Sequence, residues 1–329
     1  MEDEAAYSLH ACRVRSGRRG APGAAAPPGA IEDSARNTAI TAPMASHSDD
    51  RLTELRLRAN DVRQSIIRSL LAAGSGHSGG SLDMADVFTA LYFELMRHDP
   101  QNPDWPERDR LLLSCGHIAP VRYAAMAHAG YFPVDELLTL RHFGTRLQGH
   151  PERVSLPGLE TTSGPLGEGL AQGTGMALAA KMDRKDWRVY VVTSDGEHQC
   201  GLHWEAMMTA AKFKLDNLTC IVDRNIIQID GSTEDVMPLE PLADKYRAFN
   251  WEVFECDGND MGAFVATART ARQTTGKPQV IIAHTVIGRG VSYMEGDYLW
   301  HGKPPKPDEA AKALEELQAA RELIGAARG

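Results

Sequence analysis

The sequence predicts an α/β protein whose parallel sheet is flanked by helices on both faces. Two observations predict this fold: apolar runs rich in β-branched residues alternate with helical segments, and the runs are almost continuously apolar. Strands covered by helices on both sides have this unbroken pattern because neither face meets water. The carboxyl ends of such strands should carry the binding crevice.

Local spacing gives the individual elements. The predicted strands are 110–114, 189–193, 218–222, 251–256 and 280–283. The predicted helices are 52–73, 81–96, one ending at His128, 168–182, 203–214, 260–275 and 308–327. Ser81 is expected to cap the second helix, after a glycine-rich turn that carries His77.

Composition divides the chain into three parts. Residues 1–43 contain a stretch made wholly of Ala, Gly and Pro, and we expect a disordered extension or an upstream mis-set start, with Met44 as the true beginning. Residues 44–305 are expected to form one folded domain. Residues 306–329 are expected to be a proline-stiffened linker and an amphipathic helix.

Charge and cysteine usage exclude several classes of partner. The formal net charge is -9 and the pI is near 5.7, which argues against nucleic acid and favours a small-molecule substrate. No run is long enough to span a membrane. The five scattered cysteines do not form a disulfide pattern, so we expect a reducing, cytoplasmic location.

Two strand ends carry the most informative side chains. Asp195 follows the strand at 189–193, and Asn225 and Ile227 follow the next strand. If the two strands are neighbours, one carboxylate, one amide oxygen and one backbone carbonyl meet at the same edge of the sheet. Such hard oxygen ligands suit Mg²⁺ or Ca²⁺ shared with phosphate oxygens. The sequence therefore predicts a site for a metal-bound diphosphate.

At these residues the chain resembles the amino-terminal section of transketolase, a thiamine-diphosphate-dependent family. That family has Gly-Asp-Gly followed after some 25 to 30 residues by Asn, and here Ser194 replaces the first Gly. The resemblance covers roughly residues 52–305, with the motifs in the same order. They are Gly76-His77-Ser78-Gly79, Gly116-His117, Gly149-His150-Pro151-Glu152, Thr162-Ser163-Gly164-Pro165-Leu166-Gly167, Asp195-Gly196-Glu197, Gly201, Trp204-Glu205-Ala206, Asp223-Arg224-Asn225, Ile229-Asp230-Gly231 and His301-Gly302.

The resemblance implies the thiamine-diphosphate-binding fold, with 44–305 as its diphosphate domain, and roles for individual residues. The implied metal ligands are Asp195, Asn225 and the Ile227 carbonyl. The implied catalytic residues are His77, His117, His150 and His301, which would contact the cofactor or donor hydroxyls and move protons. The implied cofactor-binding residues are His117, Gly164, Leu166, Asp195, Gly196, Glu197 and Asn225.

Simpler interpretations exist for several of these residues. Any one of the histidines, taken alone, is more often a loop or core residue than a catalyst. His198, Cys200 and His203 could suggest zinc, but no fourth ligand follows at ordinary spacing. The segment 169–175 has glycines like a dinucleotide loop, yet it opens no strand–helix–strand unit and favours close helix packing. Cys200 stands where transketolases usually have Glu, so communication between sites through that carboxylate is in doubt.

Transketolases continue into a pyrimidine-binding domain that the resemblance does not reach in this chain. We therefore expect a split transketolase that transfers a two-carbon ketol unit from a ketose to an aldose, using thiamine diphosphate and Mg²⁺ or Ca²⁺. The expected partner is a subunit carrying the pyrimidine domain, in a two-plus-two heterotetramer. The alternatives are another thiamine-diphosphate enzyme subunit, such as a deoxyxylulose-phosphate-type synthase or a 2-oxoacid decarboxylase or dehydrogenase, and a noncatalytic scaffold. The sequence names neither sugar.

Overall fold

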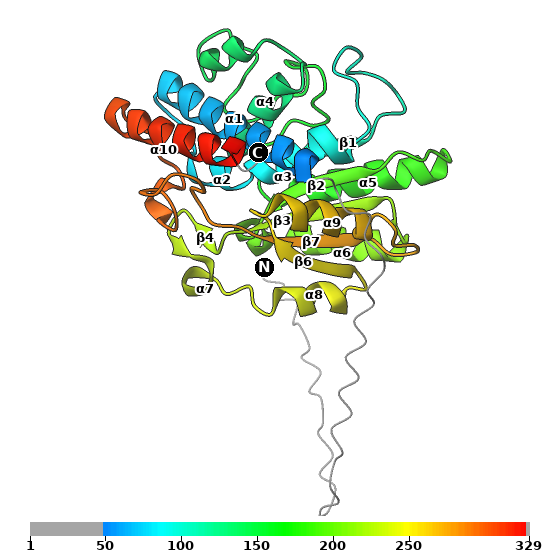
Figure 1. The fold of residues 1–329 in the computed structure, drawn as a ribbon. Coiled ribbons are helices and arrows are strands. Elements are labelled where there is room, and N and C mark those ends of the chain that lie inside the picture. Colours follow the sequence, from blue (N-terminus) through cyan, green and yellow to red (C-terminus); the bar gives the residue numbers. More distant parts are fainter. Residues whose placement is uncertain (1–48, 327–329) are drawn as a thin grey trace, which may run out of the picture. The chain divides into compact units, whose positions relative to one another are not determined.

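A parallel five-stranded sheet organises the computed structural model, which describes residues 49–326 (Figure 1). Across the sheet the order is β1-β2-β3-β7-β6, and every neighbouring pair is parallel. The strands are β1 (Arg110–Leu113), β2 (Val189–Ser194), β3 (Leu218–Arg224), β6 (Glu252–Asp257) and β7 (Gln279–His284). Each predicted strand is found within two residues of its expected ends, and the predicted fold class is confirmed.

Alternation along the strands divides the core into two layers. Val192 and Ile221 pack on one face with helices from residues 49–128 and 261–271, while Val191 and Cys220 pack on the other face with helices from residues 168–248. Since successive strand residues point to opposite faces, both sets must be apolar. This is why the strands appeared in the sequence as unbroken apolar runs.

The helices agree closely with those predicted, apart from the second and from two short helices at 233–236 and 242–248 that were not predicted. Their bounds are α1 (Asp49–Ala73), α2 (Gly79–Asp83), α3 (Ala85–Ala90), α4 (Ala119–His128), α5 (Glu168–Met182), α6 (Gly201–Lys212), α7 (Thr233–Val236), α8 (Leu242–Ala248), α9 (Met261–Ala271) and α10 (Pro307–Ala326). A small antiparallel pair, β4 (Ile227–Gln228) and β5 (Gly231–Ser232), follows β3. Short 3-10 turns lie at 116–118, 134–139, 196–199 and 298–300.

The single helix predicted over 81–96 is wrong in two respects. It is divided into α2, α3 and a π-helical turn over Leu91–Leu95, and it begins two residues earlier than expected. Ser81 is therefore no N-cap: it lies inside α2 and its hydroxyl donates to the His77 carbonyl at 2.7 Å. The first residue of α2 is closely packed, because an added Cβ at Gly79 would collide with Ile287.

The C-terminal helix α10 packs along α1 (Figure 1). Its Ala313 and Leu317 belong to the same apolar core as α1, and the Asn60 amide donates to the Leu317 carbonyl at 3.0 Å. The expectations for residues 1–43 lie outside the described residues, and the domain boundary at 305 stays a prediction. No helix within 49–326 is both long and apolar enough to cross a membrane.

Candidate active site

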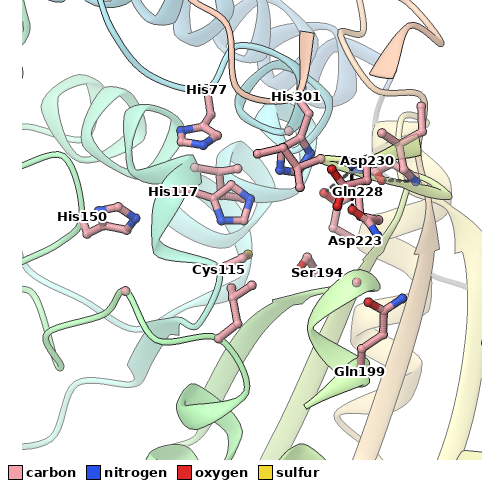
Figure 2. Close-up of a pocket in the computed structure, with 18 residues that line it drawn as sticks. His77, Cys115, His117, His150, Ser194, Gln199, Asp223, Gln228, Asp230 and His301 are labelled. Carbon is pink, nitrogen blue, oxygen red and sulfur yellow. Dashed lines mark hydrogen bonds between the residues drawn. The ribbon is translucent and has the colours of Figure 1, made fainter. Parts of the chain in front are cut away.

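A cavity of about 560 Å³ opens at the carboxyl edge of the sheet, where the fold predicts a binding crevice. Figure 2 shows His77, His117 and His150 on one side of it and Asp223, Gln228 and Asp230 on the other. The lining residues are His77, Gly80, Cys115, His117, Ile118, His150, Gly164, Leu166, Ser194, Gly196, Gln199, Asp223, Asn225, Ile227, Gln228, Ile229, Asp230 and His301.

All four predicted catalytic histidines line this one cavity, although they come from four separate segments. The rings of His77, His117 and His301 form a triangle. The centroid of the His77 ring lies 5.0 Å from that of His117 and 5.8 Å from that of His301, and the centroids of His117 and His301 are 5.2 Å apart. His150 lies farther along the wall, next to Gly164, whose added Cβ would stand 4.0 Å from the imidazole. Their convergence is unlike the scattered positions expected of unrelated loop histidines.

Burial keeps these imidazoles neutral. The pKa of His77 is lowered to about 4, first by burial and then by His301, Arg141 and His150. Burial also lowers the pKa values of His117, His150 and His301. At neutral pH each ring therefore offers one N–H donor and one bare nitrogen acceptor, the form suited to holding a hydroxyl and accepting its proton.

Asp195 lies directly after β2 and caps the 3-10 turn at 196–199, whose first residue, Gly196, lines the cavity. One carboxylate oxygen accepts from the Gly196 amide at 2.7 Å, and the other accepts from the Ile226 amide at 2.8 Å and the Arg224 guanidinium at 3.0 Å. The side chain is fully buried and does not itself line the cavity. Burial raises the pKa of Asp195 to about 6, although Arg224 opposes the shift.

Asn225 reaches the cavity from the end of β3, which is the direct neighbour of β2. Its amide nitrogen donates to one oxygen of Asp223 at 3.0 Å and one of Asp83 at 3.1 Å, while its amide oxygen accepts from the Ile227 amide at 3.0 Å. A backbone N–H can only donate, so the Ile227 amide fixes the Asn225 oxygen toward itself and the nitrogen toward the two Asp side chains. Burial raises the pKa of Asp223 to about 8 and also raises that of Asp83.

Sequence reasoning missed Asp83, Asp223 and Arg224 as site residues. Asp223 could have been found, because it directly follows the predicted strand 218–222 and pairs in register with Ser194 at the end of β2. Arg224 had a weaker signal, as a charged residue two positions beyond that predicted strand. Asp83 had none, since nothing local distinguishes an acidic residue inside a helix from a solvated one.

The predicted cofactor-contacting residues differ in their access to the cavity. Gly164, Leu166 and Gly196 line it, and Leu166 is 41% exposed. An added Cβ at Gly196 would stand 3.3 Å from Gln228, so this backbone leaves room that a side chain would close. Glu197 is instead fully buried and lines no part of the cavity, and burial raises its pKa to about 8.

The donor set suits a diphosphate cofactor and one divalent ion. Asn225 and Ile227 line the cavity beside the backbone of glycine residues. Asp195 accepts a hydrogen bond from the Ile226 amide, one residue before Ile227. Mg²⁺ takes such oxygen ligands and keeps further positions for phosphate oxygens. Arg224 and the ion would have to share the Asp195 carboxylate. Within 49–326 no cluster of three or more His, Cys, Asp or Glu side chains is arranged to hold a metal.

The two remaining motifs have structural roles. Two of the three glycines at 169–175 serve the predicted close packing: an added Cβ at Gly169 would collide with Ser114, and one at Gly173 with Val191, whereas one at Gly175 would meet no atom within 4 Å. His198 and His203 do not converge with Cys200 on a metal; both bond the hydroxyl of Tyr246, at 2.8 Å and 2.9 Å.

A doubly covered parallel sheet with an oxygen-rich, glycine-walled cavity at its carboxyl edge defines the class of protein as a cofactor-binding α/β enzyme. The family model described as "Transketolase, thiamine diphosphate binding domain" matches residues 56–321. The chain belongs to this family, and the resemblance predicted from its motifs is confirmed.

Similar proteins include both separate subunits and whole transketolases. A 6-deoxy-6-sulfo-D-fructose transketolase subunit from Clostridium sp. is 42% identical over 265 residues, 80% of this chain and 96% of the relative. An apulose-4-phosphate transketolase subunit from Actinobacillus succinogenes is 44% identical over 268 residues, 80% of this chain and 96% of the relative. The crystal structure of Campylobacter jejuni transketolase superimposes with a TM-score of 0.76 at 31% identity, covering 82% of this chain and 45% of that one.

Proposed function

We propose that this chain is the diphosphate-binding subunit of a split transketolase, which transfers a two-carbon ketol unit from a ketose to an aldose. The observation that carries the proposal is the convergence of four histidines, Asn225 and Ile227 on one cavity at the sheet edge. The relatives named as subunits are matched over almost their whole length, which supports a subunit role for the matched part of this chain.

The proposed cofactor site places the diphosphate and its ion at the ends of β2 and β3. Asp195, Asn225 and the Ile227 carbonyl would hold Mg²⁺ or Ca²⁺, and Gly164 and Gly196 would let backbone approach the cofactor. Leu166 would pack on the thiamine, and His117 and Glu197 belong to the same proposed set. Thiamine diphosphate, when bound, supplies the carbanion chemistry that the side chains lack.

The histidines would manage the protons of the sugar. His77 and His301 are assigned to the third hydroxyl of the donor, and His117 and His150 to the cofactor side and the first hydroxyl. The structure supports this division because His77 and His301 are neighbouring neutral rings, each with a buried Nδ1 atom that bonds no group among the described residues. A bare ring nitrogen can accept a hydroxyl proton.

The proposed partner is a subunit that carries the pyrimidine-binding domain, assembled with this chain as a two-plus-two heterotetramer. The chain spans about 45% of the solved transketolase that it superimposes on. Apolar side chains stand exposed near the cavity, with Ile229 63% exposed and Met237 57% exposed. Exposed apolar groups around a site favour burial by another chain. The scattered free cysteines favour the cytoplasm.

Two names among the relatives indicate specialised sugars as substrates. One relative is named for a sulfonated deoxyfructose and the other for apulose 4-phosphate. We extend to this chain only the shared chemistry, a small anionic ketose, and no particular sugar.

The deciding experiment titrates the chain with thiamine diphosphate and Mg²⁺ in a calorimeter, alone and mixed with the product of the neighbouring open reading frame. Binding and ketol transfer only in the mixture support the split enzyme. Turnover of a ketose by the chain alone would overturn the subunit proposal. No cofactor binding in either arm would favour a noncatalytic scaffold, and decarboxylation of a 2-oxoacid in the mixture would favour the other enzyme class.

A further inference from the structure

Below the cavity floor, three buried side chains meet at one hydroxyl. Tyr246 extends from α8, His203 from α6 and His198 from the 3-10 turn after β2, and all three are at most 1% exposed. The Tyr246 oxygen lies 2.8 Å from His198 Nε2 and 2.9 Å from His203 Nε2. Neither a metal nor catalysis accounts for these two histidines.

The directions of the hydrogen bonds follow from which atoms can donate. His198 Nδ1 lies 3.0 Å from the Ser194 carbonyl and 3.0 Å from the Asp195 carbonyl, and carbonyls only accept, so Nδ1 bears the proton. A neutral ring then has a bare Nε2, which accepts from the Tyr246 hydroxyl. Since that hydroxyl has one proton, His203 must donate its Nε2–H to the phenol oxygen, and the Cys220 thiol, whose Sγ lies 3.7 Å from this oxygen, can likewise only donate to it.

The chain of bonds therefore runs one way, from His203 through Tyr246 and His198 to the turn below the cavity. Both imidazoles are buried with their ring centroids 4.0 Å apart, and no carboxylate within 49–326 bonds either ring, so the neutral state is the one that burial permits. His203 Nδ1 has no partner among the described residues, as expected for the starting end of such a chain.

The turn at the receiving end carries the residues assigned to the cofactor. Ser194 and Gly196 line the cavity, and Asp195 is the proposed carboxylate ligand. The Asp195 carbonyl accepts from both the backbone amide and Nδ1 of His198, each at 3.0 Å. The Trp204 indole also donates to the His198 carbonyl at 2.7 Å, which fixes His198 from the side of α6.

We propose that His203, Tyr246 and His198 form a directed hydrogen-bond chain that holds the Ser194–Gly196 turn in its cofactor-binding conformation, with His198 as its positioning residue. The inference rests on the proposed function and adds residues that touch neither cofactor nor sugar. Groups that orient ligands from behind commonly change metal affinity or activity about tenfold or more when lost.

The first experiment examines the bonds themselves. In the full chain with ¹⁵N-labelled histidine, NMR should show His198 as the Nδ1-protonated tautomer and His203 as the Nε2-protonated tautomer, with His198→Leu and His203→Leu spectra used for assignment. Tyr246→Phe should move both signals. An Nε2-protonated His198 in the unsubstituted chain would overturn the proposal, whatever the cofactor does.

The second experiment separates positioning from general stability. Tyr246→Phe should weaken binding of thiamine diphosphate with Mg²⁺ to the mixed subunits about tenfold. The matched control, Thr219→Val, removes a buried hydroxyl that donates to Gln279 at 3.0 Å near the other end of β3. Thr219→Val should lower the melting temperature about as much as Tyr246→Phe does. It should leave the dissociation constant for thiamine diphosphate with Mg²⁺ within about twofold of the wild-type value.

The relative losses of cofactor affinity in the variants provide a third test. His203→Leu should weaken cofactor binding less than His198→Leu, because Tyr246 can still donate to His198 when His203 is gone. Cofactor affinity in Tyr246→Phe equal to that of the wild type would overturn the positioning role alone. Absent binding in the wild-type mixture would overturn the proposed function itself, and with it the cofactor role of this turn.

Discussion

At the scale of single residues, the Asp195 carboxylate already has a cation beside it. Arg224 donates to it at 3.0 Å and also reaches Glu234 and Glu240, each at 2.7 Å. A carboxylate that is fully buried needs such compensation when no metal is near. Arg224 therefore takes part of the role that a divalent ion would take.

This contact predicts the behaviour of Arg224→Gln. Without the guanidinium, Asp195 keeps only backbone donors, and removing one partner of a buried pair typically costs about 3 to 5 kcal/mol. The melting temperature of the chain should fall. Addition of Mg²⁺ and thiamine diphosphate to the mixed subunits should then raise it by more than in the wild type, because the ion replaces the lost charge.

Thermal shift with and without Mg²⁺ measures both effects. Arg247→Gln is the control, since its partner Asp244 is a surface residue three positions away and such pairs contribute little. Equal metal-dependent gains in Arg224→Gln and wild type would contradict the idea that Arg224 and the ion share Asp195.

His77 predicts how stability depends on pH. Its pKa in the folded chain is about 4, below the ordinary value near 6.5, so the unfolded chain binds the proton more readily. The contribution of the neutral His77 ring to the free energy of unfolding is therefore fully present above about pH 6.5. It is lost as the pH falls toward about 4.

Urea unfolding at a series of pH values tests this sign. His77→Asn cannot titrate, so the wild type should lose stability relative to the variant as the pH falls through that window. A difference between the two proteins that stays constant from pH 7 to about 4 would mean that burial does not disfavour the charged ring.

At the scale of elements, α5 crosses β2 closely because glycines face the strand. An added Cβ at Gly173 would collide with Val191, whereas at Gly175 no atom lies within 4 Å. Gly173→Ala should therefore cost about 1 to 3 kcal/mol of unfolding free energy through overpacking. Gly175→Ala should instead add about 0.5 to 1 kcal/mol, because alanine is the better helix former.

Chemical denaturation of the two variants gives the comparison directly. Both variants add one methyl group to the same helix, at positions two residues apart, so each is the control for the other. A loss of equal size at both positions would show that the backbone of α5, and not its contact with β2, sets the cost.

At the scale of elements, the sequence predicted the strands and two residues at their ends, but not every helix boundary. The strands were predictable because burial on both faces makes each a continuous apolar run, and Asp195 and Asn225 were predictable because parallel strands end at one edge. The division of the helix predicted over 81–96 was not predictable, because apolar residues keep helical spacing through Met84, where α2 ends and α3 begins.

The candidate site was predicted to a similar extent. The four histidines converge as the motifs implied, because glycine turns and strand ends bring their segments to the same edge. The environment of Asp195 was not predictable: whether a carboxylate faces a cavity or a guanidinium depends on backbone angles after the strand, such as the positive φ of 65° at Ile226.

At the scale of the whole molecule, this chain accounts for only part of the transketolase structure that it matches. Its described residues bring four histidines and the Asn225 amide to the cavity, and the match covers 45% of that transketolase. Gln199, which lines the cavity, donates to the Met237 carbonyl at 3.1 Å, so the exposed Met237 side chain stands near the cavity edge. A partner that closes the cavity should bury this side chain.

Met237→Asp tests that expectation without altering the cavity lining. A carboxylate in an apolar contact would have to lose its water, so association with the partner should weaken at least about tenfold. Leu323→Asp is the matched control, an equally drastic change at a leucine on α10 that is 74% exposed. Native mass spectrometry should show the two-plus-two assembly for the control and free chain for Met237→Asp, with both variants melting like the wild type. If Met237→Asp assembles normally, the partner covers another face, and the proposed contact near the cavity edge is wrong.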